Sequence, residues 1–133
     1  MTLTHIQPQG LLELPGLTQV IVASGSRHVF IAGQAPVTPD GILIGPGDLA
    51  EQTRAVCERL QICLSAAGAT VGDLVRMTIY VVDFDESALD AIYAGAAAVF
   101  GESLPAPTST LLGVAALLLP GQRIEIDAIA VLG

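Results

Sequence analysis

Two carboxylates interrupt an apolar stretch near the C-terminal end of the chain. Glu125 and Asp127 lie within residues 124–130, where all the remaining residues are isoleucine or alanine. Residues two apart in an extended strand face the same side, so both acids share one face with Arg123. That face either is solvated or lines a cleft. In a cleft, a carboxylate would be suited to orienting or deprotonating water.

Small hydroxyl residues begin the preceding apolar stretch. Thr108, Ser109 and Thr110 come directly before Leu111. Such residues commonly form turns and caps. If a cleft exists beside Glu125, the same hydroxyls would lie next to it.

Several chemistries are excluded because their residues are missing. All five bases are arginine, so there is no lysine for a Schiff base with pyridoxal phosphate or for a P-loop. The net charge is −8, and the aromatic residues are two Tyr and three Phe, with no Trp. This balance disfavours binding to nucleic acid or to an anionic membrane.

The cysteines and histidines do not predict a metal site or a disulfide. Cys63 lies six positions after Cys57, which on one helix is a rise of ~9 Å, beyond disulfide reach. Neither Cys-x-x-Cys nor His-x-x-x-His spacing is present with His5 or His28. The acids at positions 83, 85, 86 and 90 are interpreted as the start of a helix rather than a cation site.

The first half of the chain predicts a hairpin, a loop and a helix. β-branched runs at Gln19–Ala23 and His28–Ala32 flank a turn composition at residues 24–27. Proline and glycine signals predict an irregular loop over residues 37–47. Asp48 and Glu51 predict a capping box that opens a helix, which Gly68 ends.

The second half predicts a central strand, a helix and two further strands. Residues 73–83 have few polar interruptions, so we expect a central strand covered on both faces. A helix follows and ends at Gly101, and strands are expected at Thr108–Leu117 and Arg123–Val131. Helical spacing predicts two buried stripes: Leu49, Thr53, Val56, Cys57, Leu60, Leu64 and Ala67 on the first helix; Leu89, Ile92, Tyr93, Ala96, Val99 and Phe100 on the second.

The order β-β-α-β-α-β-β predicts a single α+β domain over residues 1–133, with two helices on one face of one sheet. No helix remains to cover the other face, so we expect that face to be buried against another subunit. The uncharged apolar run Gly113–Leu119 is too short to span a membrane. With no signal-peptide pattern in residues 1–9, we expect a cytoplasmic protein.

Three segments resemble one known family. Phe30–Pro36 followed by Asp40 and Gly41 looks like its "SGQ-x-P…D-G" motif, and Ala66–Ala69 with Asp73–Val81 looks like its helix-to-strand segment. Glu125–Ala130 looks like its terminal "E-I-E-A-I-A" strand. The chain is thereby identified as similar to the Rid family (YjgF-type, also labelled L-PSP endoribonuclease), from about residue 15 onward.

The resemblance implies a chorismate-mutase-like fold and a homotrimer with three clefts between subunits. It also implies cofactor-independent hydrolysis of enamines and imines to ketones and ammonia, with a small molecule as ligand. In such members an Arg near the start of the fifth strand binds the substrate carboxylate, and a Glu on the last strand positions water. Backbone near the Gly of "SGQ" adds hydrogen bonds.

Carried onto this chain, the pattern is only partly matched. Glu125 stands at the Glu and Gly33 at the Gly, but the Arg position falls at Ser109 or Thr110. Leu17 and Ala32 replace a Tyr and a Ser that assist, and an Asn of the second helix becomes an Asp at position 90. A hydroxyl does not replace a guanidinium as a partner for a carboxylate. We therefore expect iminium carboxylates derived from amino acids to bind poorly.

Three functions remain open at this point. The first is a Rid-type hydrolase with altered substrate choice, in which Glu125 activates water. Ser109, Thr110 and backbone around Gly33 and Leu111 would then hold a neutral ligand. The second is a non-catalytic trimer that binds a metabolite or protein, and the third is an endoribonuclease, which the acidic charge disfavours. Arg123 is either a substitute cation that leans into the cleft or an exposed residue at the start of its strand.

Overall fold

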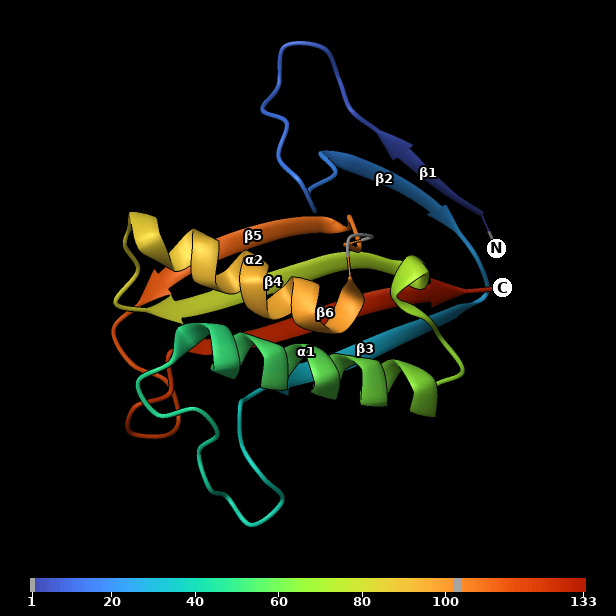
Figure 1. Cartoon of the computed structure of the whole chain (residues 1–133). Helices are drawn as coiled ribbons and strands as arrows, with labels where there is room; N and C mark the ends of the chain where they lie inside the picture. The colour runs from blue at the N-terminus through green and yellow to red at the C-terminus, as the bar shows by residue number, and fades with distance from the viewer. Residues whose placement is uncertain (1, 102–103) are drawn as a thin grey trace.

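A computed structural model describes residues 2–101 and 104–133. In the N-terminal half, the strands are β1 (Thr2–Ile6), β2 (Val20–Ser24) and β3 (Arg27–Gln34), followed by helix α1 (Leu49–Ala66). A short 3₁₀ helix, η1 (Val71–Asp73), leads into the C-terminal half. There the elements are β4 (Leu74–Val82), α2 (Glu86–Phe100), β5 (Thr108–Val114) and β6 (Ile124–Leu132). Figure 1 shows this order in space.

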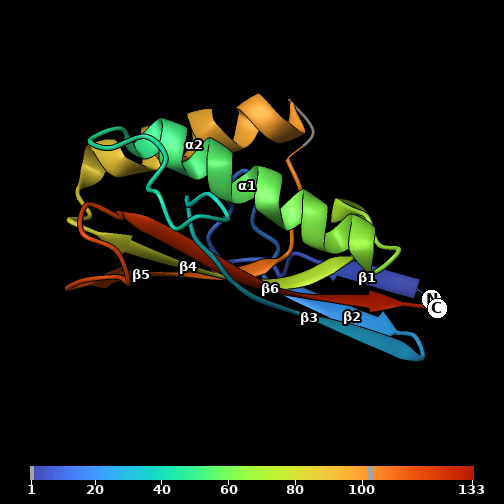
Figure 2. The ribbon, with the colours of Figure 1, turned by 90° about the horizontal axis from the view of Figure 1, so that it is seen from below.

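The helices form one layer against a four-stranded sheet of order β3-β6-β4-β5. The β4–β5 pair is parallel, and β6 pairs antiparallel with both β3 and β4. Both helices cover the same face of this sheet (Figure 2), which confirms the predicted α+β class with two layers. The expectation of a single sheet is wrong, because β1 and β2 form a separate two-stranded sheet.

The predicted hairpin between residues 19 and 32 is also wrong. β2 pairs with β1 and β3 pairs with β6, although only two residues separate β2 from β3. Gly25, in this short link, packs against the carbonyl of Leu132 and the side chain of Val131 at the end of β6. The chain therefore passes from one sheet to the other instead of turning back, and the unpredicted β1 supplies the partner of β2.

Helix α1 begins and ends where its caps predict. The Asp48 side chain accepts a hydrogen bond from the Glu51 N–H, and Gly68 follows the helix with a φ of 75°, a conformation suited to glycine. The second half of the predicted capping box is absent, because the Glu51 carboxylate pairs with Arg54 instead. The apolar side of α1 packs on β6 and β3, and α1 and β6 together supply most of the core.

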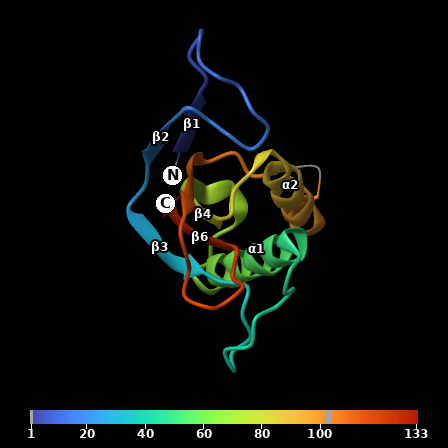
Figure 3. The ribbon, with the colours of Figure 1, turned by 90° about the vertical axis from the view of Figure 1, so that its left-hand side faces the viewer.

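Helix α2 lies beside α1 (Figure 3) and packs closely against it, and its Ala88 and Ile92 belong to the same core cluster as residues of the sheet. Asp85 caps it by accepting from the Ala88 N–H, which agrees with the helix interpretation of the acids near residue 85. Its buried residues are Ala88, Ile92 and Gly95, and a side chain at Gly95 would collide with the Ala50 carbonyl of α1. The predicted stripe is thus only partly buried, because α1 approaches along its small-residue edge.

The sheet face opposite the helices, here called the outer face, is open in the single chain. β4 is central as predicted, but its outer-face residues Arg76, Thr78 and Tyr80 are only half-buried. On β3, Phe30 is 74% exposed. The expected cover on both faces of β4 is therefore absent within one chain. Among the described residues, no helix is long and apolar enough to cross a membrane.

Candidate functional site

Glu125 is held in place on the outer face by a buried amide. Alternation along β6 puts Ile124 and Ile126 into the core and leaves Glu125 half-buried on the opposite side. The Gln122 side chain, 2% exposed, donates to the Ile124 carbonyl (3.2 Å) and to Glu125 Oε1 (3.4 Å). Gln122 Oε1 in turn accepts from the Leu119 N–H. The turn before β6 therefore fixes the amide that contacts the carboxylate.

Gly33 lies against this carboxylate from the neighbouring strand. Between Ile31, opposite Ala128, and Gln34, opposite Ile126, the register of β3 on β6 shifts. Two residues of β3 thus face one of β6, as in a β-bulge. A Cβ built at Gly33 would overlap the Glu125 carboxylate, so the absent side chain leaves room for the acid. The structure brings Glu125 and Gly33 together at this bulge, of which Ala32 is the other residue.

A tyrosine and the second acid flank Glu125 on the outer face. Tyr80 lies opposite Glu125 in the β4–β6 register, and its hydroxyl donates to Asp127 Oδ2 at 2.9 Å. The pKa of Tyr80 is raised, first by this hydrogen bond, then by burial and by the charges of Asp127 and Glu125. The phenol of Tyr80 is therefore protonated at neutral pH, beside the two acids.

The β5 hydroxyls divide between the two sides of the sheet. Thr110 accepts a hydrogen bond from Arg76 Nη2 at 2.6 Å, and both belong to the outer-face set of residues. Ser109, one position earlier, lines a cavity on the helix side. Of the two positions predicted to replace the family Arg, only Thr110 thus shares the face of Glu125.

Arg123 does not extend toward Glu125. Its guanidinium donates to the carbonyl oxygens of Val82 (3.2 Å) and Asp83 (2.8 Å), at the end of β4. In this arrangement Arg123 ties the start of β6 to the end of β4. Arg123 is half-buried, and its bonds to backbone carbonyls are those of neither sequence-based alternative, the cation that leans into a cleft or the exposed residue at the start of the strand.

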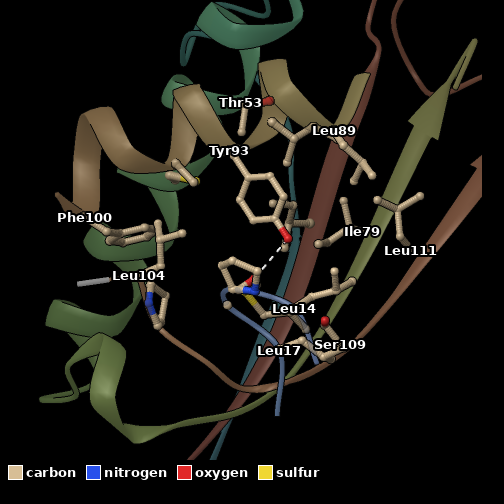
Figure 4. Close-up of a pocket in the computed structure, with 18 of the residues that line it drawn as sticks. Leu14, Leu17, Thr53, Ile79, Leu89, Tyr93, Phe100, Leu104, Ser109 and Leu111 are labelled. Atoms are coloured by element: carbon tan, nitrogen blue, oxygen red, sulfur yellow. Dashed lines mark hydrogen bonds between the residues drawn. The ribbon is translucent and has the colours of Figure 1, made fainter. Parts of the chain in front are cut away.

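A cavity of about 240 Å³ lies between α2 and the β4–β5 part of the sheet. Leu17, Ser109 and Leu111, all predicted site residues, line it (Figure 4). The hydroxyl of Tyr93 donates to the Pro15 carbonyl at 2.9 Å and so holds the segment before Leu17 at its rim. The predicted site residues thus form two groups on opposite faces of the sheet, which reasoning from strand alternation did not separate.

Four residues near these groups were not predicted as site residues: Arg76, Tyr80, Tyr93 and Gln122. Alternation along residues 74–82 would have placed Arg76 and Tyr80 on one face. Gln122 follows a Pro-Gly turn and carries no pattern of its own. In the described ranges, no group of three or more His, Cys, Asp or Glu residues is arranged to hold a metal ion.

Comparison with known proteins agrees with the fold. The α+β fold with two helices on one face of a mixed sheet is that of the YjgF class. The family model described as "Endoribonuclease L-PSP" matches residues 16–132. The chain therefore belongs to this family, which is also called the Rid family.

Individual relatives of the chain support the same family assignment. A RutC family protein of Pyrococcus horikoshii is 39% identical over 106 residues, 78% of this chain and 79% of the relative. A 2-iminobutanoate/2-iminopropanoate deaminase of Mus musculus is 32% identical over 108 residues, 80% of this chain and 76% of the relative.

Among solved structures, the Rid family protein YyfB of Yersinia pestis is 36% identical with a TM-score of 0.87, covering 99% of this chain and 100% of that one. The YjgF gene product of E. coli is 33% identical with a TM-score of 0.64, covering 82% and 84%.

Proposed function

We propose that this chain is a Rid-type hydrolase that converts an imine, or the enamine in equilibrium with it, to a ketone and ammonia. The observation that carries the proposal is the Glu125 carboxylate, held by the Gln122 amide and lying against the backbone of Gly33. The 2-iminobutanoate deaminase among the relatives supports the reaction class.

In the proposed reaction, Glu125 takes a proton from water as the water oxygen attacks the imine carbon. The C=N π electrons move to nitrogen, which takes up a proton, and a carbinolamine forms. Loss of ammonia from the carbinolamine then gives the C=O bond. Each turnover consumes one imine and one water and needs no redox partner, which fits a site built from a carboxylate and backbone groups.

We further propose that the site is completed between the subunits of a homotrimer. The outer face carries Glu125 together with exposed apolar side chains, including Phe30 and Leu112, and a face of this kind is typical of a subunit interface. A second chain packed there would enclose the carboxylate and exclude bulk water.

The substrate proposed here is an imine without a carboxylate next to the reacting carbon. The position of the family's carboxylate-binding Arg carries a hydroxyl, Ser109 or Thr110, and Arg123 is engaged with backbone carbonyls. Loss of one partner of a desolvated charge pair costs about 2–5 kcal/mol. This cost corresponds to roughly a thirtyfold to several-thousandfold lower affinity for iminium carboxylates.

The test uses three kinds of imine, formed in situ: imines of amines that carry no carboxylate, imines of neutral amino acids and imines of acidic amino acids. Their hydrolysis by wild type is compared with their hydrolysis by Glu125→Gln. We expect wild type to accelerate the carboxylate-free imine above its spontaneous rate and Glu125→Gln to lose at least a hundredfold of that acceleration. Glu86→Gln, the same change in an exposed acid of α2, is the matched control and should keep full activity.

A second candidate function is a non-catalytic trimer that binds a metabolite. The replaced Arg position favours it, because the family's charged contact to substrate is gone. If wild type accelerates none of the imines yet binds a ketone or an imine analogue, this second function holds and the hydrolase proposal is wrong.

A further inference from the structure

We infer that Gln52 of α1 is a positioning residue for the proposed hydrolase, and that it holds the Glu125 carboxylate in place by acting through Gln122. The inference rests on the proposed function, in which Glu125 activates water, but the geometry behind it can be tested without any turnover. Gln52 acts from the helix layer, on the other side of the sheet from the carboxylate, so its role is to position the acid and not to take part in the reaction.

The side chain of Gln52 is fully buried and is bonded to backbone at both ends of its amide. Its nitrogen donates to the carbonyls of Gly121 (3.0 Å) and Gly45 (3.2 Å), and its oxygen accepts from the Arg123 N–H at 2.8 Å. Each of these bonds is costly to lose, because a buried polar group would be left without a partner. The amide therefore fixes the backbone at three points that are distant in the sequence.

Two of the three points lie on either side of Gln122. The Gly121 carbonyl belongs to the peptide group before Gln122, and the Arg123 N–H belongs to the peptide group after it. With both peptide groups held, the direction in which the Gln122 side chain leaves the backbone is set. That side chain reaches Glu125 Oε1 at 3.4 Å, the long end of the hydrogen-bond range, so a small rotation of the turn would break the contact.

The third point belongs to the loop that follows β3. The N–H of Ile44 donates to the Pro36 carbonyl at 2.8 Å, which joins the segment just before Gly45 to a residue three positions after Gly33. Gln52 therefore also holds the loop that leaves the bulge at Gly33. Both segments that contact the carboxylate, the bulge and the turn before β6, are thus connected to one amide of α1.

Nuclear magnetic resonance can test the link from Gln52 to Gln122 directly. Gln52→Met keeps the approximate length of the side chain and removes its donor and acceptor. We expect the side-chain N–H signals of Gln122, identified by their loss in Gln122→Met, to move toward the values of free glutamine. Val56→Ala, one turn along α1 and also fully buried, disturbs the core without touching this network, so it should leave those signals in place. Unchanged Gln122 signals in Gln52→Met would overturn the inference.

The kinetic test is a double-mutant cycle on an imine that carries no carboxylate. Gln52→Met and Gln122→Met should each lower kcat at least tenfold and leave KM within about threefold, because the acid is misplaced and not removed. Val56→Ala should keep the wild-type kcat. The double variant should be no more than about twofold slower than the slower single variant, since both substitutions interrupt the same path. Losses that multiply in the double variant, or an unchanged kcat in Gln52→Met, would show that Gln52 does not act through Gln122.

Two glycines of the loop give a milder, matched pair of variants that leave the buried amide in place. Gly45 and Gly47 have similar positive φ values, 68° and 75°, so an added side chain strains both backbones alike. A Cβ at Gly45 would meet the Glu51 side chain of α1 at 2.8 Å, whereas a Cβ at Gly47 meets nothing within 4 Å. Gly45→Ala should therefore push the loop away from Gln52, shift the Gln122 signals and lower kcat at least threefold beyond Gly47→Ala. If the two variants behave alike, the inference is wrong.

The two measurements separate this inference from the proposed function. If wild type hydrolyses none of the imines, the hydrolase proposal fails, and the resonance comparison alone then decides whether Gln52 holds the Gln122 amide. If wild type is active and Glu125→Gln is not, while Gln52→Met keeps both the Gln122 signals and the wild-type kcat, the hydrolase proposal stands and the positioning role of Gln52 is wrong.

Discussion

Gly33 of β3 and Glu125 of β6 fit together so closely that the carboxylate occupies the space where a side chain at position 33 would begin. The contact arises at the register shift between Ile31 and Gln34, where β3 has one residue more than β6. The strand irregularity and the acid are thus parts of one arrangement. The glycine is needed here for space and not for its backbone conformation, because its φ lies outside the left-handed region.

Gly33→Ala should therefore damage the site more than the fold. The added methyl group must displace either the carboxylate or the backbone of the bulge, and we expect a loss of at least tenfold in imine hydrolysis or, if the chain only binds, in ligand affinity. The matched control is Gly72→Ala, because a Cβ there meets nothing closer than Thr70 Oγ1 at 3.6 Å. A Gly33→Ala protein with wild-type activity would show that the carboxylate position is unimportant.

Local signals in the sequence were sufficient to predict both helices and the strand that contains Glu125. Asp48, Asp85 and Gly68 act within one turn of their own positions, so their effects could be read directly. Alternation along residues 124–130 likewise placed Glu125 and Asp127 on one face, as the structure has them. These features depend only on neighbouring residues, which is why they were predictable.

Features that depend on distant residues were missed. The prediction of a β2–β3 hairpin was wrong because Gly25, in the link between the two strands, packs against the end of β6, more than a hundred residues away in the sequence. Gln52 of α1 is fully buried. Its side-chain amide donates to the carbonyls of Gly45 and Gly121 and accepts from the Arg123 N–H. No local sequence pattern predicts such a role. Alternation puts the consecutive residues Ser109 and Thr110 on opposite faces, but which of them shares the face of Glu125 depends on the register of β5 on β4 and of β4 on β6.

The proposed trimer predicts that the outer face is sensitive to charge. Light scattering of wild type should give about 41 kDa, three times the 13.6 kDa of one chain. Phe30→Glu places a charge in the proposed interface and should shift the protein to monomers. Ile62, 66% exposed on α1, lies on the helix side, so Ile62→Glu should leave the assembly intact. A well-folded wild-type monomer would contradict the interface and the enclosed cleft.

The two cysteines should differ in reactivity. Cys57 is 2% exposed and burial raises its pKa to about 12, whereas Cys63 is half-buried. Alkylation requires an accessible thiolate. With iodoacetamide at about pH 8, mass spectrometry should find Cys63 modified and Cys57 protected, and both modified in denaturant. Labelling of Cys57 as fast as Cys63 in the folded protein would contradict the packing of α1.

The Tyr80–Asp127 hydrogen bond should be visible in a titration. The folded pKa of Tyr80 is raised, so its contribution to stability is complete below the unfolded value of about 10 and is lost as the pH rises through the folded value. In a Tyr93→Phe background, where Tyr80 is the remaining tyrosine, absorbance near 295 nm reports its ionisation.

Asp127→Asn should lower the Tyr80 pKa more than Glu125→Gln does. Asp127 supplies the hydrogen bond that is the main cause of the shift, while Glu125 acts through charge alone. Equal effects of the two substitutions would show that the hydroxyl does not donate to Asp127.

The division of the β5 hydroxyls predicts where a substrate-binding arginine can be restored. Thr110 belongs to the outer face with Glu125, and Ser109 faces the apolar cavity. Thr110→Arg should therefore raise kcat/KM for imines that carry a carboxylate at least tenfold, even though Arg76 lies beside it, because a bidentate guanidinium recovers part of the lost charge pairing. Imines without a carboxylate should gain nothing.

Ser109→Arg is the matched control for that restoration. It places a guanidinium against apolar walls without a carboxylate partner, and an unpaired charge of this kind is expensive to bury. We expect a lower melting temperature and no gain on carboxylate substrates. If Ser109→Arg improves these substrates and Thr110→Arg does not, the carboxylate subsite lies on the helix side of the sheet, and the assignment of the reaction to the outer face around Glu125 is wrong.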